Sequence, residues 1–369
     1  MIILTYYKNN ELLKANKGEW SEIYVLFRLL SEGKLYSYDN KHITDQNNYL
    51  DVLRIIRKEY CSNRYEYVID GVQVKIYLNN NLINSIGRSI FRDYADILYS
   101  EIKKGKGRNF SISKIEEFMK KINCYRVTES SYSKTDIVIQ VYNSKNNFYK
   151  NKSFSIKSFM GNPPSLLNAN DSTNFIFELT GINDKLINYI NSIDSSNKIQ
   201  KRMKLIFSEF NSIKFVKVQD IIFNNNMMFI DSNMPEFISN LLIYHYRYNI
   251  SFSNDIIDRL AKDNPMNYPD ISFYEYKYKK FLSALALGMT TTVKWDGKEI
   301  NDGGNILVNS KGFVFVNMFD NRDYFEDFLY INTKIERAST IKFDYAKLYK
   351  ENNKVFLKLN LQIRFKQLN

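Results

Sequence analysis

Two runs of alternating residues, 135–141 and 154–159, most constrain how this chain can fold. In the first, Thr135-Asp136-Ile137-Val138-Ile139-Gln140-Val141, and in the second, Phe154-Ser155-Ile156-Lys157-Ser158-Phe159, apolar and polar side chains alternate. This alternation is typical of strands, and the Asn/Lys-rich stretch 143–152 between them is typical of a turn. The pattern predicts a hairpin with Asp136 and Lys157 on adjacent strands.

A carboxylate at the start of one strand and a lysine on its neighbour are the skeleton of a Mg²⁺-dependent site that cleaves phosphodiesters. The carboxylate holds the metal, and the lysine orients or activates the attacking water. On spacing alone, a solvated cross-strand ion pair is the more common interpretation, because a single short motif has a high false-positive rate. Further features of the sequence are needed to distinguish a nuclease site from an ion pair.

Composition bounds the class of protein. The 369 residues, 44% of them hydrophobic, suffice for two domains or one large elaborated domain. The sequence contains neither an apolar run of ~18 residues nor a secretory signal, so we expect a cytoplasmic protein that does not enter a membrane. Two cysteines, Cys61 and Cys124, are too few for a disulfide framework or a zinc site, and His42 and His245 are too few for a histidine-rich metal centre.

The net charge of +12 and the aromatic content of 15% favour a polyanionic partner, of which nucleic acid is the most common. The coding bias of an AT-rich genome is the alternative explanation for the many Lys, Asn, Ile and Tyr residues. No phosphate-binding glycine motif occurs, so nothing supports a nucleotide-hydrolysing motor.

Residues 16–33 predict a helix that Asn16 caps and Gly33 ends. It is apolar most of the way round and is therefore expected to be buried. Glu22 shares a stripe with Val25, Leu26 and Leu29, where a carboxylate is costly unless it is paired with a Lys or Arg or bound to a metal. Glu19, one turn earlier, is a competing candidate.

The remaining pattern predicts a second, C-terminal region. We expect helices over 46–60, 81–104, 112–122 and 183–210, a hairpin over 65–77, and strands over 173–179, 306–308 and 355–365. We place an approximate domain boundary near residue 182. Residues 1–182 are expected to form the catalytic region, and the helical and β-rich residues 183–369 are expected to recognise DNA. Candidates for contacting bases lie around Lys294–Gly304 and Glu336–Lys342.

The order of helix, strand with Asp136, turn, and strand ending in Ile156-Lys157 resembles the PD-(D/E)XK nuclease core, a mixed central sheet flanked by helices. This sequence departs from that pattern at Thr135, where the motif has proline, and at Ser155, where it has the second acidic residue. Several branches of the superfamily carry that acid on the first helix. The archaeal Holliday-junction resolvases have a Gly-x-x-x-Glu at a helix start, which Gly18 and Glu22 match.

More narrowly, the chain resembles the HpaII family of type II restriction endonucleases. The matching segments run from the first helix to the last strand: Lys-Gly-Glu-Trp-Ser-Glu at 17–22, Thr-Asp-Ile-Val-Ile-Gln-Val at 135–141, Phe-Ser-Ile-Lys-Ser at 154–158, Leu-Leu-Asn-Ala at 166–169, Thr-Asn-Phe at 173–175, Ala-Leu-Gly-Met-Thr at 286–290 and Leu-Asn-Leu-Gln-Ile-Arg-Phe at 359–365. The resemblance implies a mixed α/β fold and cleavage of double-stranded DNA at CCGG with Mg²⁺, for which Mn²⁺ can substitute. It also implies a cognate cytosine-5 DNA methyltransferase that protects the host.

From the residues and the resemblance together, we expect Asp136, Glu22 and the backbone carbonyl of Ile156 to hold one or two Mg²⁺ ions. Lys157 orients the attacking water. Ser155 contacts the phosphate or a water at the metal, and Gln140 either touches the site or merely packs.

Two rival functions stay open: a structure-specific nuclease such as a junction resolvase, and a non-catalytic DNA-binding protein with a decayed site. A homodimer is one alternative for the oligomeric state.

Overall fold

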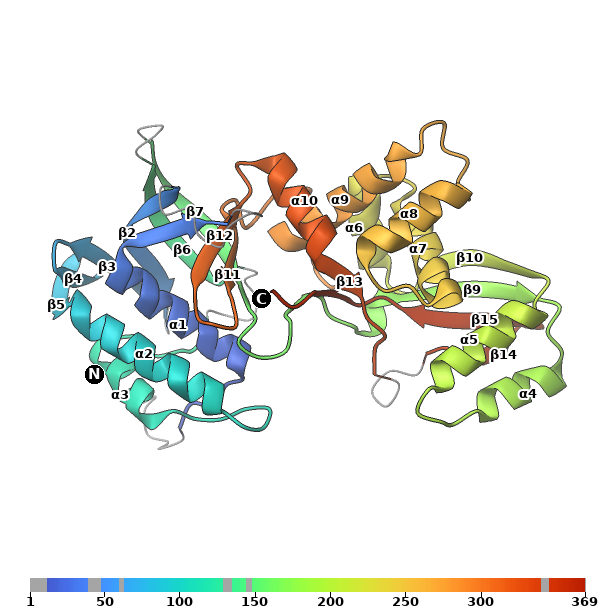
Figure 1. The fold of residues 1–369 in the computed structure, drawn as a ribbon, viewed down its shortest axis with the longest axis horizontal. Helices are drawn as coiled ribbons and strands as arrows, with labels where there is room; N and C mark the ends of the chain where they lie inside the picture. Colours follow the sequence, from blue (N-terminus) through green and yellow to red (C-terminus); the bar gives the residue numbers. More distant parts are fainter. Residues whose placement is uncertain are drawn as a thin grey trace. The chain divides into compact units, whose positions relative to one another are not determined.

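The computed structural model describes residues 12–38, 48–59, 63–128, 135–143, 148–339 and 345–368. The chain forms two compact units, the first made of 1–164, 300–322 and 367–369 and the second of 165–299 and 323–366 (Figure 1). The boundary expected from sequence lies near residue 182, whereas these units part after Pro164. Residues 300–322 return to the first unit from the C-terminal half of the chain.

The first unit is built on a nine-stranded sheet of order β1-β12-β11-β7-β6-β2-β3-β4-β5. The strands are β1 (Lys34–Ser37), β2 (Tyr49–Lys58), β3 (Arg64–Asp70), β4 (Gln73–Leu78), β5 (Asn81–Gly87), β6 (Ile137–Asn143), β7 (Phe148–Ser158), β11 (Gly304–Val308) and β12 (Val314–Met318). The sheet is mixed, because β1 with β12 and β7 with β11 are parallel and the other pairs are antiparallel.

This sheet closes on itself. β1 pairs with β2 as well as with β12, so β1, β12, β11, β7, β6 and β2 form a closed six-stranded barrel. The mixed α/β character expected from sequence is confirmed, and the expected mixed central sheet is present, but six of its strands close into a barrel that the sequence did not predict. The PD-(D/E)XK assignment itself stays a prediction.

The described residues of this unit form three helices: α1 (Lys17–Glu32), α2 (Arg88–Lys104) and α3 (Ser113–Lys121). The predicted first helix is confirmed at both ends. Asn16 and Glu19 form a capping box at its start, and Gly33, at φ 65°, ends it in the left-handed region that glycine tolerates. Apolar residues of α1 are fully buried against the sheet and α2, as its nearly continuous apolar surface predicts.

One predicted helix is wrong and another is wrong over its first turns. Residues 46–60 contain β2, which pairs with β1, β3 and β6; Leu50 and Val52 alternate there as a strand requires, and the β-branched Ile55 and Ile56 suit a sheet. The helix predicted over 81–104 is correct only for α2, because residues 81–87 form β5 against β4. The hairpin over 65–77 and the helix over 112–122 are confirmed as β3–β4 and α3.

The second unit contains most of the helices and two smaller sheets. Its helices are α4 (Asp184–Ser192), α5 (Lys198–Glu209), α6 (Ile221–Ile230), α7 (Met234–Tyr248), α8 (Ser253–Asp263), α9 (Ser272–Leu287), α10 (Arg322–Asn332) and a short 3₁₀ turn (Asp171–Thr173). Its strands are β8 (Ser165–Leu167), β9 (Asn174–Thr180), β10 (Ser212–Val218), β13 (Thr333–Ile335), β14 (Leu348–Glu351), β15 (Lys354–Asn360) and β16 (Ile363–Phe365).

These strands pair in the orders β10-β9-β15-β14 and β13-β16-β8. The single strand predicted over 355–365 is therefore two strands, β15 and β16, in different sheets. Across the described residues no helix is long and apolar enough to cross a membrane.

Candidate active site

The hairpin predicted over 135–159 is present as β6 and β7, which pair antiparallel with Ile137 opposite Phe154. Asp136 comes immediately before β6. Its backbone N–H donates to the carbonyl of Phe154 at 3.0 Å, and its side-chain Oδ2 accepts from the N–H of Ile156 at 2.6 Å. The carboxylate thus occupies the edge of β7 at the point where β6 begins.

The backbone of Ile156 faces this carboxylate. In a strand the N–H and C=O of one residue point to the same side, as the paired exchange of hydrogen bonds between antiparallel strands requires. Because the Ile156 N–H points to Asp136, its carbonyl oxygen points to the same edge. The structure therefore brings together Asp136 and the Ile156 backbone, two of the three predicted metal ligands.

Ser155 and Lys157 lie on the opposite face of β7 from the helices. Phe154 belongs to the hydrophobic core that includes α1, and side chains alternate along a strand, so those of Ser155 and Lys157 point away from that core. Lys157 is half-buried and lies opposite Leu307 of β11. Ser155 is only 4% exposed, and its hydroxyl donates to Oδ1 of Asn305 on β11 at 2.6 Å.

Gln140 lies further along β6, opposite Asn151 of β7 and Arg54 of β2. Four residues of strand correspond to about 13 Å, so the position on β6 is well separated from Asp136. Its predicted role at the site stays a prediction.

The first turns of α1 lie over the C-terminal end of β7. The hydroxyl oxygens of Ser21 and Ser158 are 2.7 Å apart in a buried hydrogen bond. Glu22 follows Ser21 and is half-buried, on the α1 side of the sheet. Glu19 has a structural role instead, because its Oε2 accepts from the N–H of Asn16 at 2.7 Å in the capping box.

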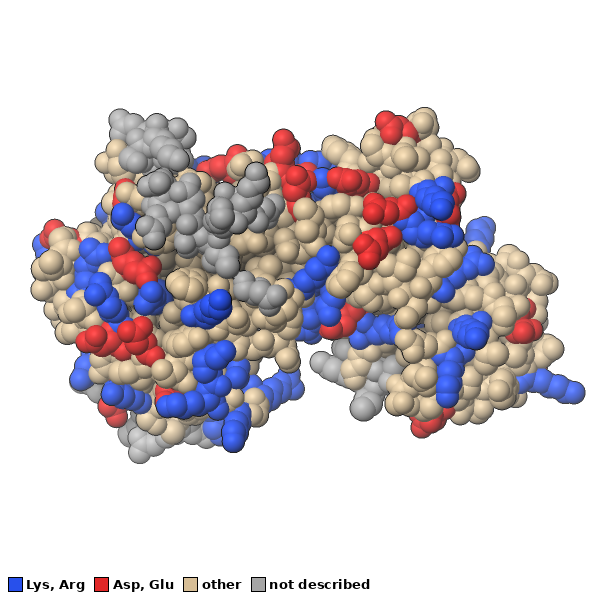
Figure 2. All heavy atoms as spheres, in the orientation of Figure 1, with Lys and Arg blue, Asp and Glu red and all other residues tan. Residues whose placement is uncertain are grey.

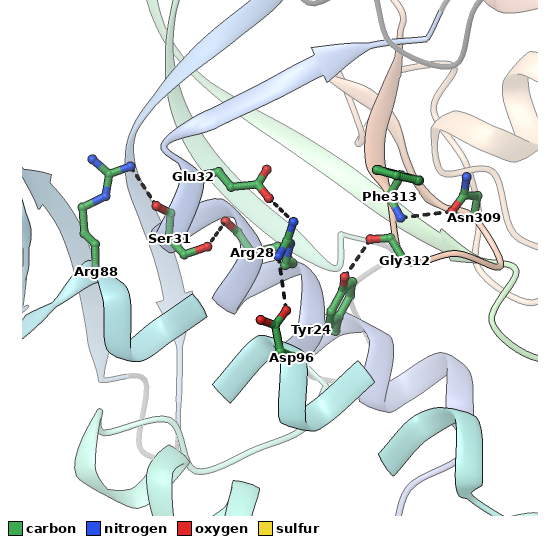
Figure 3. Close-up of polar contacts among 9 residues, drawn as sticks. All are labelled: Tyr24, Arg28, Ser31, Glu32, Arg88, Asp96, Asn309, Gly312 and Phe313. Atoms are coloured by element: carbon green, nitrogen blue, oxygen red, sulfur yellow. Dashed lines mark hydrogen bonds and ion pairs between the residues drawn. The ribbon is translucent and has the colours of Figure 1, made fainter. Parts of the chain in front are cut away.

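Helix α1 is fixed to the turn between β11 and β12 by one buried hydrogen bond (Figure 3). The hydroxyl of Tyr24 donates to the carbonyl of Gly312 at 2.7 Å, and burial raises the pKa of Tyr24 to about 12. The turn is itself tied by Asn309, whose Oδ1 accepts from the N–H of Phe313 at 3.0 Å.

A second set of polar contacts fixes the C-terminal half of α1 to α2 (Figure 3). Arg28 pairs with Glu32 on its own helix and with Asp96 of α2 at 3.5 Å. Arg88 of α2 donates to the carbonyl of Ser31 at 3.0 Å. Burial raises the pKa of the Glu32 carboxyl, and the neighbouring Arg28 partly offsets this. With both ends of α1 held, the position of Glu22 is held too.

The segment before β11 supports the other side of the site, whereas the sequence had suggested base contacts for residues 294–304 and did not predict this role. Thr135 donates to Oδ1 of the buried Asn301 at 3.0 Å, which fixes the residue before Asp136. The N–H of Gly303 donates to the carbonyl of Ser153 at 2.9 Å, and a Cβ on Gly303 would lie 2.4 Å from the Phe154 ring. The Gly-Gly turn was visible in the sequence, but nothing local showed that it packs on β7.

The donor set at this site fits a hard divalent cation. Among the described residues no group of three or more His, Cys, Asp or Glu side chains is arranged to hold a metal ion. Mg²⁺ is usually bound through one or two carboxylates, with water and substrate phosphate completing the shell. Asp136 and the Ile156 carbonyl supply oxygen atoms of that kind, and Glu22 as the third ligand, from the α1 side of the sheet, stays a prediction.

In the second unit, a groove of about 800 Å³ lies along the sheet of β10, β9, β15 and β14. Its charged lining is four lysines, Lys217, Lys347, Lys354 and Lys358, against one glutamate, Glu351. Tyr349 and Phe356 of the same lining stack with ring centroids 5.6 Å apart. The groove therefore combines positive charge with aromatic surface, which suits a nucleic acid.

Charge is unevenly distributed on both units. Figure 2 shows acidic side chains over α10, where Asp323, Glu326 and Asp327 line a separate cavity. Lys279 and Lys280 line the same cavity and pair with Asp327 and Glu326. Figure 2 also shows basic side chains over the C-terminal end of α2, whose last turn contains Lys103 and Lys104.

The first predicted base-contacting segment, 294–304, is exposed at Lys294 and over 296–300 and is buried from Asn301 onward, apart from the half-buried Asp302. The loop in which it begins is held by a buried side chain. Asn226 of α6 is fully buried, and its amide donates to the carbonyls of Thr290 and Val293 at 2.8 Å and accepts from the N–H of Trp295 at 2.9 Å. Lys294 is exposed on this loop. Of the other segment, residues 340–342 lie outside the described part of the chain.

Comparison with known proteins identifies the class. The model of the HpaII restriction endonuclease family matches residues 16–365, nearly the whole chain. The chain belongs to this family of type II restriction endonucleases, which are site-specific deoxyribonucleases.

A relative within it is the type II restriction enzyme HpaII of Haemophilus parainfluenzae, to which the chain is 36% identical over 359 residues, 96% of this chain and 99% of that protein. No solved structure matches the chain.

Proposed function

We propose that this protein is a restriction endonuclease that hydrolyses double-stranded DNA at CCGG with Mg²⁺, and that Mn²⁺ can substitute. The observation that carries the chemistry is the Asp136 carboxylate, 2.6 Å from the Ile156 N–H on the strand that bears Lys157. The sequence CCGG comes from the family relationship, since the relative with 36% identity is an enzyme named HpaII.

Each residue has one task in this proposal. Asp136, Glu22 and the carbonyl of Ile156 would hold the metal, which supplies electrostatic stabilisation of charge on the phosphate in the transition state. Lys157 holds the attacking water in line with the phosphate through its ammonium group. Ser155 contributes a neutral oxygen where the motif has a carboxylate.

The helix α1 and the strands β6, β7 and β11 make up the proposed PD-(D/E)XK core. Two features support this: Asp136 at the start of one strand, and the Ser-x-Lys sequence at the end of its antiparallel neighbour. The parallel pairing of β7 with β11 supplies the mixed sheet that such a core needs.

The second unit is proposed to contact DNA through its basic groove. The lysine ammonium groups there suit phosphate oxygens, which fix a protein on the duplex without sequence information. The loop around Lys294, which Asn226 holds in place, is proposed to contact bases. Bases are read through hydrogen-bond donors and acceptors in the DNA grooves, and a loop that is fixed before binding positions its donors for this.

The biological setting follows from the activity. An enzyme that cuts CCGG needs a cognate cytosine-5 DNA methyltransferase to protect host DNA, and both act in the bacterial cytoplasm. CCGG is its own complement, so a homodimer with one site per strand is the proposed form on DNA.

Digestion of a plasmid with the full-length protein and Mg²⁺, followed by sequencing of the ends, tests this function. Ends at CCGG, with protection when cytosines of the site are methylated, are the expected result, and D136A is the matched control. Ends at an unrelated sequence would overturn the proposed specificity. Cutting that follows junction shape would favour a structure-specific nuclease, and binding without cutting would favour a non-catalytic protein.

A further inference from the structure

A row of side chains crosses the sheet at the level of the proposed site. Ser155 of β7 lies in register with Asn305 of β11, which lies opposite Asn317 of β12. Both asparagines are fully buried, and Ser155 is nearly so. On the other edge of β7, Asp136 bonds to the backbone on either side of Ser155, at Phe154 and Ile156. Ser155 therefore stands between Asp136 and Asn305.

The hydrogen bond between Ser155 and Asn305 determines what the serine can do. A hydroxyl has one proton to donate and two lone pairs that accept. Ser155 donates to Oδ1 of Asn305 at 2.6 Å, an amide oxygen that can only accept. Its proton is thus turned toward β11, and its lone pairs stay available on the side of Asp136.

We propose that Asn305 is a positioning residue that holds Ser155 as an acceptor, so that a neutral serine oxygen serves where related sites have a carboxylate. The inference rests on the proposed function of this site. Without Asn305, the hydroxyl proton would be free to turn to the Asp136 carboxylate and compete there with a cation.

The composition of this layer supports a role beyond packing. Nδ2 of Asn305 is buried and has no hydrogen-bond partner among the described residues. Leaving a buried donor unsatisfied destabilises a fold. Leu307 lies two residues after Asn305 on β11, on the same face of the sheet, and is fully buried. An apolar side chain therefore fits on the face that carries Asn305. Asn317, in the same row, is buried with neither side-chain polar atom bonded among the described residues, whereas Asn305 makes one bond there, to Ser155. That bond, rather than stability, is what the asparagine at 305 supplies.

The experiment measures metal affinity separately from cleavage. All variants of the full chain are made in a K157A background, which the proposal expects to be inactive with its ligands intact. Mn²⁺ is titrated into each protein bound to a CCGG duplex, and the loss of the free-ion EPR signal gives the dissociation constant. In parallel, the Mg²⁺ dependence of cleavage is measured with Lys157 present.

The expected result is a raised dissociation constant for Mn²⁺ in N305L, about tenfold or more, since loss of an outer partner of a metal site commonly has that effect. S155A should weaken binding similarly, and the double variant should be no weaker than either single one, because both changes remove the same contact. N305D keeps an acceptor and should bind as tightly as its parent or more tightly. N317L, the same change one strand further from Ser155, is the matched control and should bind as its parent does.

A folded N305L with unchanged Mn²⁺ affinity would overturn the proposal, as would additive losses in the double variant. If N305L does not fold, S155A and N305D test the proposal instead. Weakened Mn²⁺ binding in N305D would contradict it, because it would show that the amide N–H of Asn305 donates to Ser155 rather than the serine hydroxyl to Asn305. Failure of the wild-type protein to cut any DNA would overturn the proposed function, while the Mn²⁺ results would still test Asn305.

Discussion

His245 of α7 should make the stability of the second unit depend on pH. Its ring is buried, and its Nδ1 is bonded to the carbonyl of Ile250, which can only accept, so the neutral ring carries its proton on Nδ1. Burial lowers the pKa of His245 to about 4, and the positive charge of Arg337 acts in the same direction. Its ordinary value is 6.5. The folded state thus strongly prefers the neutral ring.

The sign and size follow from linkage. Between pH 6.5 and pH 4 the unfolded chain binds the proton and the folded chain does not, so the contribution of His245 to stability is complete above pH 6.5 and is lost as the pH falls. A shift of about 2.5 units corresponds to roughly 3 kcal/mol when the loss is complete, and about 2 kcal/mol should be lost between pH 7.5 and pH 5. For a cooperative unit of this size, 2 kcal/mol lowers Tm by roughly 4–8 °C.

The assay compares the wild-type chain with H245N by calorimetry at pH 7.5 and pH 5. Asparagine keeps an N–H donor near the position of Nδ1 and removes the titrating group, so carboxylates that titrate in both proteins cancel in the comparison. H245N should lose about 2 kcal/mol less than the wild type over this interval. Equal losses in the two proteins would refute the reasoning, as would an NMR titration that placed the His245 pKa near its ordinary value. The chain has only two histidines, so the resonances can be assigned.

The remaining predictions concern the candidate site. D136A and K157A should each abolish turnover, measured on a plasmid, while binding to a CCGG duplex stays within about threefold, since most phosphate contacts lie elsewhere; a large loss of binding would contradict this. E22Q should be inactive and E19Q active, with E19Q losing about 1 kcal/mol or less of stability through the weakened cap. An inactive E19Q with an active E22Q would show that Glu19, one helical turn earlier, is the metal ligand. Mg²⁺ and Mn²⁺ should support cutting, and Ca²⁺ should support binding alone, because carboxylate and carbonyl oxygens suit hard cations; full activity in EDTA would exclude the mechanism.

The parts of the site that local sequence determines could be predicted from it. The start of α1 depends on Asn16 and Glu19, three residues apart, and its end on Gly33, so a short window contains both signals. The β6–β7 hairpin is equally local, and it alone brings Asp136 close to Ile156. The prediction failed in β2, where the spacing of the apolar residues is compatible with both a helix and a strand. Pairing with β1, β3 and β6 makes this segment a strand.

The parts that depend on distant pairing could not be predicted. β11 follows β7 by about 150 residues, and no pattern in either strand states that they pair in parallel. Sequence could therefore predict that Ser155 stands where the motif has a carboxylate, but it could not supply Asn305 as its hydrogen-bond partner. The same holds for Asn301, which reaches Thr135 only because residues 300–322 return to the first unit.

The hairpin of β11 and β12 is bonded both to the strand that carries Ser155 and to the helix that carries Glu22. At one end of β11, Asn305 holds Ser155, and the Gly303 backbone holds the carbonyl of Ser153. At the other end, the turn at Gly312 accepts the hydroxyl of Tyr24 and so fixes the helix that carries Glu22. The proposed function has a carboxylate on a helix and a serine on a strand act on one phosphate, which requires their spacing to be constant to a fraction of an ångström. One short hairpin that is bonded to both, inside a closed ring of strands, provides that constancy.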